Sequence, residues 1–338
     1  MGNDPTFTRA FVNWSLVKAR QGDFPAAQQQ IQQALKISPD DVGALTTLGM
    51  IEGKMGHHQE SIQAFRKVIL LSPDSADGHL NLGIALADQF DLHGALQEFT
   101  ESIRLDPDHA SAYYNKGRVL YDLNRRQEAI PFLETACRLQ PDYPAALYLL
   151  AVALGASPRV RDVLERLVAI DPQNADAHYL LGQELLRVGR TQDAIAHWKT
   201  AVKLDPQNSS SLYKLARTLA NVNDPQAKEY MDRYEALQSV RQMSDKVQTL
   251  NNSALQAADA HNWPQAVEQL QQAIQLCGQC KQLPVLHRNL GLIYARKGDI
   301  EHAKGELGLA LKTDPPDADA AEALNILNHL QAPVSGSN

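Results

Sequence analysis

Residues 76–107 read ADGHLNLGIALADQFDLHGALQEFTESIRLDP, and this stretch sets the pattern for most of the chain. It contains two segments with apolar residues at helical spacing, which include Leu86 and Phe99 and meet at Asp91. Such spacing predicts two short amphipathic helices. Asp106-Pro107 should end the second helix, because proline cannot continue a helix and restricts the residue before it.

Small residues recur through the chain at the position of Gly83. At this position a bulkier side chain would hold the second helix away, and Ala95 is expected at the facing contact. Successive members are separated by 34, 34, 34, 34, 31, 34, 38 and 37 residues. The column consists of Ser15, Gly49, Gly83, Gly117, Ala151, Gly182, Ala216, Ala254 and Gly291. A second column follows Ala27, Ser61, Ala95, Ala129, Ala194, Ala266 and Ala303, and a third follows Pro39, Pro73, Pro107, Pro141, Pro172, Pro206 and Pro315.

This period and its three columns resemble the tetratricopeptide repeat. The resemblance covers roughly residues 8–315 and implies an all-α, right-handed superhelical solenoid of about nine helix-turn-helix repeats. The first helices of such repeats line a concave groove. After the last repeat, residues 317–331 are predicted to form a capping helix that covers the final apolar face. Its expected apolar stripe is Ala323, Ile326, Leu327 and Leu330.

Two irregularities divide the array. The fifth repeat, Pro144–Pro172, is three residues short, so the stacking should kink there. Residues 226–263 contain neither glycine nor proline. We therefore expect a long second helix to about Met243, with the next helix starting at Ser244-Asp245. The predicted domains are an array at 8–224, a spacer helix at 225–245, a second array with its cap at 246–331 and a disordered tail at 332–338. The alternative is an ordinary repeat with a lengthened helix and no independent domain.

Composition and motifs argue against several function classes. The formal net charge is −7, from 32 basic and 39 acidic residues, and no clustered basic stripe predicts nucleic-acid binding. No apolar run approaches the ~18 residues of a membrane span, so membrane insertion is not expected. The N-terminus lacks the pattern of a secretory signal. Phosphate-binding, nucleophile-elbow and zinc-protease motifs are absent, so the sequence predicts neither an enzyme nor a cofactor or metal site.

Two of the three cysteines, Cys277 and Cys280, lie close together at the end of a predicted second helix. They could form a disulfide, remain inert thiols, or serve a metal or redox function. A zinc site would need two more ligands, and a thioredoxin-like site would need a preceding strand. A disulfide would favour an exported, periplasmic or secreted protein, whereas the cytoplasm is the default without one. Cys137 is expected to be a small buried apolar residue.

The family resemblance also indicates a binding surface. In this family the residue two before the small position points into the groove, and that column reads Asn13, Thr47, Asn81, Asn115, Leu149, Leu180, Lys214, Asn252 and Asn289. Such a ladder of asparagines resembles the superhelical arm of O-GlcNAc transferases, where asparagines hold the backbone of an extended peptide. An amide offers an acceptor and two donors, so it can pair with a peptide C=O and N–H. The expected peptide-groove residues are Asn13, Thr47, Asn81, Tyr114, Asn115, Arg118, Tyr148, Tyr179, Gln183, Tyr213 and Arg217.

The sequence lacks the residues of a second binding mode known in this family, the clamp for a C-terminal carboxylate. In chaperone co-factors of this family, basic residues in the third repeat clamp a C-terminal carboxylate. If the comparison begins at the first repeat of this chain, those positions hold Asp77 and Asn81; if it begins at the third repeat, they hold Ala145 and Leu149. The sequence therefore predicts a non-catalytic scaffold that binds a protein or an extended peptide, and not a carboxylate clamp. The alternative is a substrate-recruiting or regulatory arm of an enzyme, such as a glycosyltransferase, whose catalytic part lies outside this chain. The predicted capping helix favours the scaffold.

Overall fold

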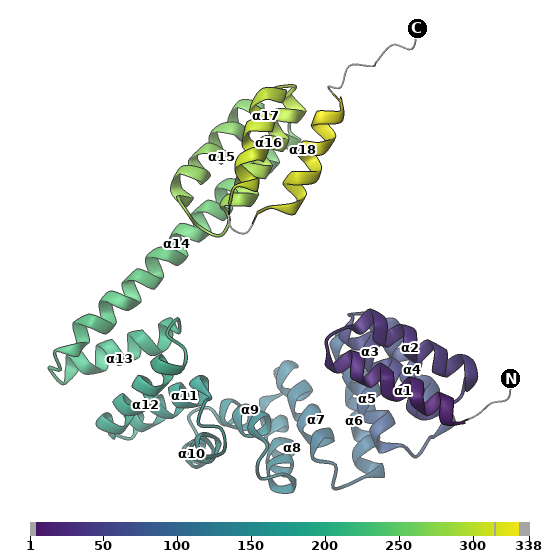
Figure 1. The fold of residues 1–338 in the computed structure, drawn as a ribbon. Helices are drawn as coiled ribbons and strands as arrows, with labels where there is room; N and C mark the ends of the chain where they lie inside the picture. Colours follow the sequence, from purple (N-terminus) through teal and green to yellow (C-terminus); the bar gives the residue numbers. More distant parts are fainter. Residues whose placement is uncertain (1–4, 314–315, 331–338) are drawn as a thin grey trace. The chain divides into compact units, whose positions relative to one another are not determined.

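The computed structural model describes residues 5–313 and 316–330, and every regular element within those ranges is a helix. The chain divides into two compact units between Pro206 and Gln207. The first unit contains six helical hairpins that follow one another along the chain (Figure 1). Their helices are α1 (Pro5–Arg20), α2 (Phe24–Ile37), α3 (Val42–Lys54), α4 (His58–Leu71), α5 (Ala76–Asp88), α6 (Leu92–Leu105), α7 (Ala110–Asp122), α8 (Arg126–Leu139), α9 (Pro144–Leu154), α10 (Val160–Ile170), α11 (Ala175–Arg187) and α12 (Thr191–Leu204).

Local sequence signals set where these helices begin and end. Several helices are capped by a side-chain oxygen that accepts a hydrogen bond from a backbone N–H three residues on, as Ser75 does from Gly78. The turn inside each hairpin needs one residue with positive φ, which Gly56 supplies without strain. Phe90 occupies the equivalent position with a φ of 65° and with 87% of its surface exposed.

The small-residue column packs against a large side chain of the second helix. A Cβ atom added at Gly83 would lie 2.6 Å from Cε1 of Phe99, and one at Gly182 would lie 2.5 Å from Nε1 of Trp198. The residue that faces Gly83 most closely is thus Phe99, one turn beyond the expected Ala95. Trp198 is fully buried against Gly182, whereas Trp14 on α1 is 53% exposed and is not a core residue.

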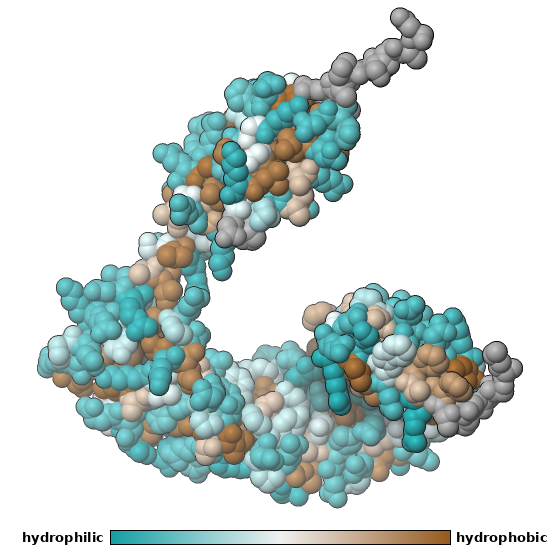
Figure 2. Space-filling model, viewed as in Figure 1, coloured by the Kyte–Doolittle hydropathy of each residue, from teal (hydrophilic) through white to brown (hydrophobic). Residues whose placement is uncertain are grey.

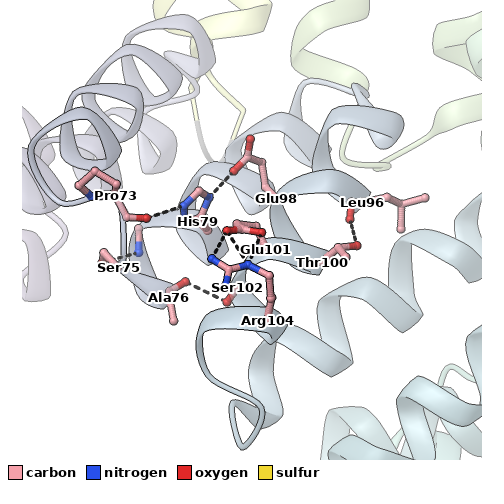
Figure 3. Close-up of polar contacts among 11 residues, drawn as sticks. Pro73, Ser75, Ala76, His79, Leu96, Glu98, Thr100, Glu101, Ser102 and Arg104 are labelled. Carbon is pink, nitrogen blue, oxygen red and sulfur yellow. Dashed lines mark hydrogen bonds and ion pairs between the residues drawn. The ribbon is translucent and has the colours of Figure 1, made fainter.

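A histidine network joins the helices of the third hairpin (Figure 3). His79 on α5 contacts the carboxylate of Glu98 on α6 through Nδ1, at 2.7 Å, and the carbonyl oxygen of Pro73 through Nε2, at 3.1 Å. Ser102 donates to the carbonyl oxygen of Ala76 at 2.8 Å. These bonds hold the second helix of the hairpin to the beginning of its first helix.

The helix contacts define an inner wall in this unit. Consecutive first helices contact one another from α1 to α9, whereas consecutive second helices make no comparable contacts in the described part of the unit. A stack in which only the first helices touch curves with those helices on the inside, so the first helices form a groove wall. The next pair of first helices, α9 and α11, contact each other less extensively than the earlier pairs do.

The second unit is built on one long helix (Figure 1). The structure corrects the predicted break at Ser244-Asp245: a single 34-residue helix continues through both residues. This helix pairs at one end with the preceding helix and at the other with the following one. The helices are α13 (Ser209–Asn221), α14 (Gln226–Asp259), α15 (Trp263–Cys277), α16 (Leu283–Lys297), α17 (Ile300–Leu311) and α18 (Ala318–Leu330).

The expected boundaries shift accordingly. The division lies at residues 206–207 rather than after residue 224, because α13 packs on α14. The capping helix is present as α18, but its buried stripe includes Ala320 and Leu327, whereas Ile326 is 52% exposed. The proposed tail at residues 332–338, and the side chain of Leu330, lie outside the described residues.

Candidate functional site

The groove wall of the first unit carries three half-buried tyrosines on successive first helices, Tyr114 on α7, Tyr148 on α9 and Tyr179 on α11. The ring of Tyr114 lies 5.0 Å from that of Tyr143, centroid to centroid. Burial raises the pKa of the Tyr143 phenol, against a hydrogen bond with Ser111 that lowers it. Burial also raises the pKa of Tyr148. The phenols of Tyr143 and Tyr148 therefore stay neutral at physiological pH, and all of these rings offer flat apolar surface with a polar tip.

The asparagine ladder is less available than the sequence predicted. Asn115 is 8% exposed, and its Nδ2 donates to the carbonyl oxygen of Ser111 in its own helix at 2.8 Å. The hydroxyl of Thr47, which is also buried, donates to Gly43 in the same way at 2.9 Å. Asn13 is exposed on α1. Half-buried Asn81 makes no side-chain hydrogen bond within residues 5–313 and 316–330, so its amide is free for a ligand.

Arg118 lies one turn beyond Asn115 on α7. Its Nε is buried and has no hydrogen-bond partner among the described residues. It is close enough to Tyr143 to influence the pKa of that phenol. A buried donor without an acceptor costs roughly 1–3 kcal/mol, so turning the Arg118 guanidinium toward an acceptor that a ligand supplies would remove this cost.

The remaining predicted groove residues are partly satisfied by one another. Gln183 donates through Nε2 to the hydroxyl of Tyr179 at 2.5 Å. Tyr213 and Arg217 lie on α13 in the second unit, where Arg217 donates to the Tyr213 hydroxyl at 3.2 Å. The structure therefore places those two residues in a different unit from the other nine. Sequence reasoning missed Tyr143, because it precedes Pro144 in a turn and belongs to none of the repeated columns.

Two ladder asparagines of the second unit, Asn252 and Asn289, also form hydrogen bonds within the protein. Asn289 donates to Oδ1 of Asn251 at 2.8 Å, and both residues are buried. Asn252 accepts a hydrogen bond from Gln248 on its own helix. Internal hydrogen bonds thus occupy ladder asparagines in both units.

The repeat is matched by established family profiles. Tetratricopeptide repeat profiles match residues 46–110, 89–144 and 114–175, and another such profile matches residues 175–208. Residues 46–208 of this chain belong to the tetratricopeptide repeat family. No curated protein sequence matches the chain.

Solved structures of tetratricopeptide repeat architecture are similar to this fold. PilF of Pseudomonas aeruginosa is 19% identical, with a TM-score of 0.57 over 63% of this chain and 98% of the other. PilW, a type IV pilus biogenesis factor, is 19% identical, with a TM-score of 0.54 over 62% of this chain and 98% of the other. Identities this low support the shared fold alone.

The second unit contains two of the three cysteines. Cys277 at the end of α15 and Cys280 in the following turn are joined by a disulfide bond, with the Cα atoms 5.1 Å apart. Cys137 is a free buried thiol on α8, and burial raises its pKa to about 11. None of the helices in the described ranges combines the length and the apolar content needed to cross a bilayer.

Proposed function

We propose that this tetratricopeptide repeat protein is a non-catalytic interaction scaffold whose first unit binds an extended peptide segment of a partner protein along the first-helix wall. Proteins of the family are generally protein-interaction scaffolds, which supports the general class. The observation that carries the specific proposal is the buried Arg118 Nε–H, which has no acceptor among the described residues, together with the half-buried Asn81 amide and the tyrosines on the same first helices.

These groups suit a peptide backbone better than a folded surface. The Asn81 amide can pair with one backbone C=O and N–H, and the Arg118 Nε–H needs one acceptor. The tyrosines add apolar area and lose little side-chain entropy on binding. An extended chain advances about 3.3 Å per residue, so neighbouring helix pairs about 10 Å apart meet it roughly every three residues.

Hydrogen exchange on the full chain tests where a peptide binds. Twelve-residue peptides would be selected from a random library on the immobilised protein, and exchange would be followed with and without a selected peptide. The proposal predicts added protection in α5, α7 and α9, with little change in the second helices α6 and α8. Protection confined to second helices, or to the second unit, would contradict it.

A further inference from the structure

A pocket of about 300 Å³ lies between the first helices α9 and α11 and the second helix α10. Its apolar lining comes from all three helices and includes Val152 on α9, Leu164 on α10 and Leu180 on α11. Ala156, in the turn between α9 and α10, completes one side. The pocket therefore lies within the first unit and is bordered by the first helices that carry Tyr148 and Tyr179.

The shortened fifth repeat accounts for this pocket. Helices α9 and α10 have 11 residues each, whereas α7 and α8 of the preceding hairpin have 13 and 14. Helix α9 contacts the preceding first helix, α7, but does not contact the following first helix, α11, to a comparable extent. The missing turn of helix thus leaves space that a regular hairpin would fill.

We infer that this pocket binds one neutral apolar side chain, of the size of leucine, isoleucine, methionine or phenylalanine, from the peptide held along the wall. The inference rests on the proposed function. Leu149 and Leu180 occupy the ladder positions that Asn81 and Asn115 hold in earlier repeats, so the wall changes from polar to apolar next to the pocket. Pockets for whole small molecules range from ~300 to 1,000 Å³, so this one suits a single side chain better than a separate ligand.

The charges at the pocket select against an ionised side chain. Glu184 is 6% exposed and accepts hydrogen bonds from Nε and Nη2 of Arg187 at 2.8 and 2.5 Å. These are the two charged residues of the lining, and they neutralise each other. An acidic or basic side chain entering the pocket would be buried without a free counter-charge, which is unfavourable.

The distance between the pocket and Arg118 also predicts how many peptide residues separate the two contacts. The pocket lies about one and a half repeat spacings, roughly 15 Å, from Arg118 on α7. An extended peptide covers that distance in about four or five residues. Selected peptides should therefore carry one apolar anchor at a constant position relative to the segment that contacts Arg118.

Two variants with opposite effects on pocket size test the inference on the full chain. Val152→Phe should fill the pocket and weaken a leucine-anchored peptide from the random library by about 10- to 100-fold. Changing the anchor of that peptide to alanine should cost a similar factor on the wild type and little on Val152→Phe. Leu180→Ala should enlarge the pocket and shift selection toward phenylalanine or tryptophan, a gain of preference that misfolding cannot produce.

The outcomes separate this inference from the proposed function. Selected peptides that lose affinity on Arg118→Met but show no apolar anchor, or that ignore both pocket variants, would overturn the pocket assignment and leave groove binding intact. Failure of the library to yield any peptide whose affinity depends on Asn81 or Arg118 would overturn both.

Discussion

A Cβ atom at Gly83 would lie 2.6 Å from Cε1 of Phe99, a separation that real Cβ contacts do not show. The first helix of the hairpin therefore approaches the ring as closely as a glycine allows. Gly83→Leu should lower the stability of the full chain by roughly 1–3 kcal/mol or more, because the two helices must separate in a close-packed interior. Chemical denaturation followed by circular dichroism measures the change.

A matched glycine provides the control. A Cβ at Gly305 in α17 would meet nothing within 4 Å, so Gly305→Ala should raise stability by roughly 0.5–1 kcal/mol through the lower entropy of the unfolded chain. Combining Gly83→Ala with Phe99→Ala should cost less than the sum of the two single changes. Additive losses would show that the glycine and the ring do not share this contact.

Proline at position 244 tests the continuity of α14. Ser244→Pro falls inside a continuous helix and should cost roughly 3 kcal/mol, with new protease cleavage near residue 244. Ser244→Ala should be neutral or slightly stabilising. If a new helix instead began at this serine, proline would be accepted in its first turn, and both variants would resist protease equally.

Acid should weaken the sixth hairpin through its histidine pair. His178 Nδ1 lies 2.9 Å from His197 Nδ1, where the third hairpin has His79 beside Glu98. Burial, and then the His178 ring, lower the pKa of His197. The unfolded imidazole titrates near ~6.5 and gains its proton first, so this stability is fully present above that pH and is lost as pH falls below it.

Replacing one histidine isolates the effect. His197→Glu restores the His–Glu arrangement seen at His79 and at His287. Denaturant unfolding at pH 7.5 and pH 5.5 should show a smaller acid-induced loss in this variant than in the wild type. Equal losses would show that the acid sensitivity does not come from the His178–His197 pair.

Thiol labelling tests the cysteine assignments. Native oxidised protein should react with iodoacetamide at none of its three cysteines, because Cys277 and Cys280 are bonded and the buried Cys137 thiol has a pKa of about 11. Mass spectrometry should find two labels after reduction and three after reduction with unfolding. Complete labelling of the pair without reductant would remove the argument for an oxidising compartment.

The repeated columns predicted the hairpins because each column residue has a local physical role. Pro107 and its equivalents mark helix ends, and Gly83 marks a close contact. The break at Ser244-Asp245 was wrong for a local reason too: a capping residue starts a helix only where the preceding helix has ended, and nothing near Met243 ends it. Val240 and Met243 are exposed on this stretch, where Figure 2 shows a hydrophobic strip along the long helix.

The groove could be predicted only in part. The position of a residue in the repeat indicates which wall it lies on, and the first helices do form one wall. Whether its polar atoms are free depends on its neighbours: Asn115 and Asn289 form internal hydrogen bonds, whereas the Asn81 side chain forms none with the described residues. The pocket between α9 and α11 depends on how neighbouring helices pack when a turn is missing. The three-residue deletion indicated an irregularity there, but not a cavity.

The most direct test of groove binding is isothermal titration of one library-selected peptide against the full chain and against its Asn81→Ala/Arg118→Met double variant. Loss of two neutral or charge-assisted hydrogen bonds should weaken binding by about 1–4 kcal/mol, while the circular dichroism melt stays unchanged. Arg66→Met, an exposed change on second helix α4, serves as the matched control and should leave the affinity unaltered. Equal affinity of the double variant, the control and the wild type would contradict the proposal that this wall binds the peptide.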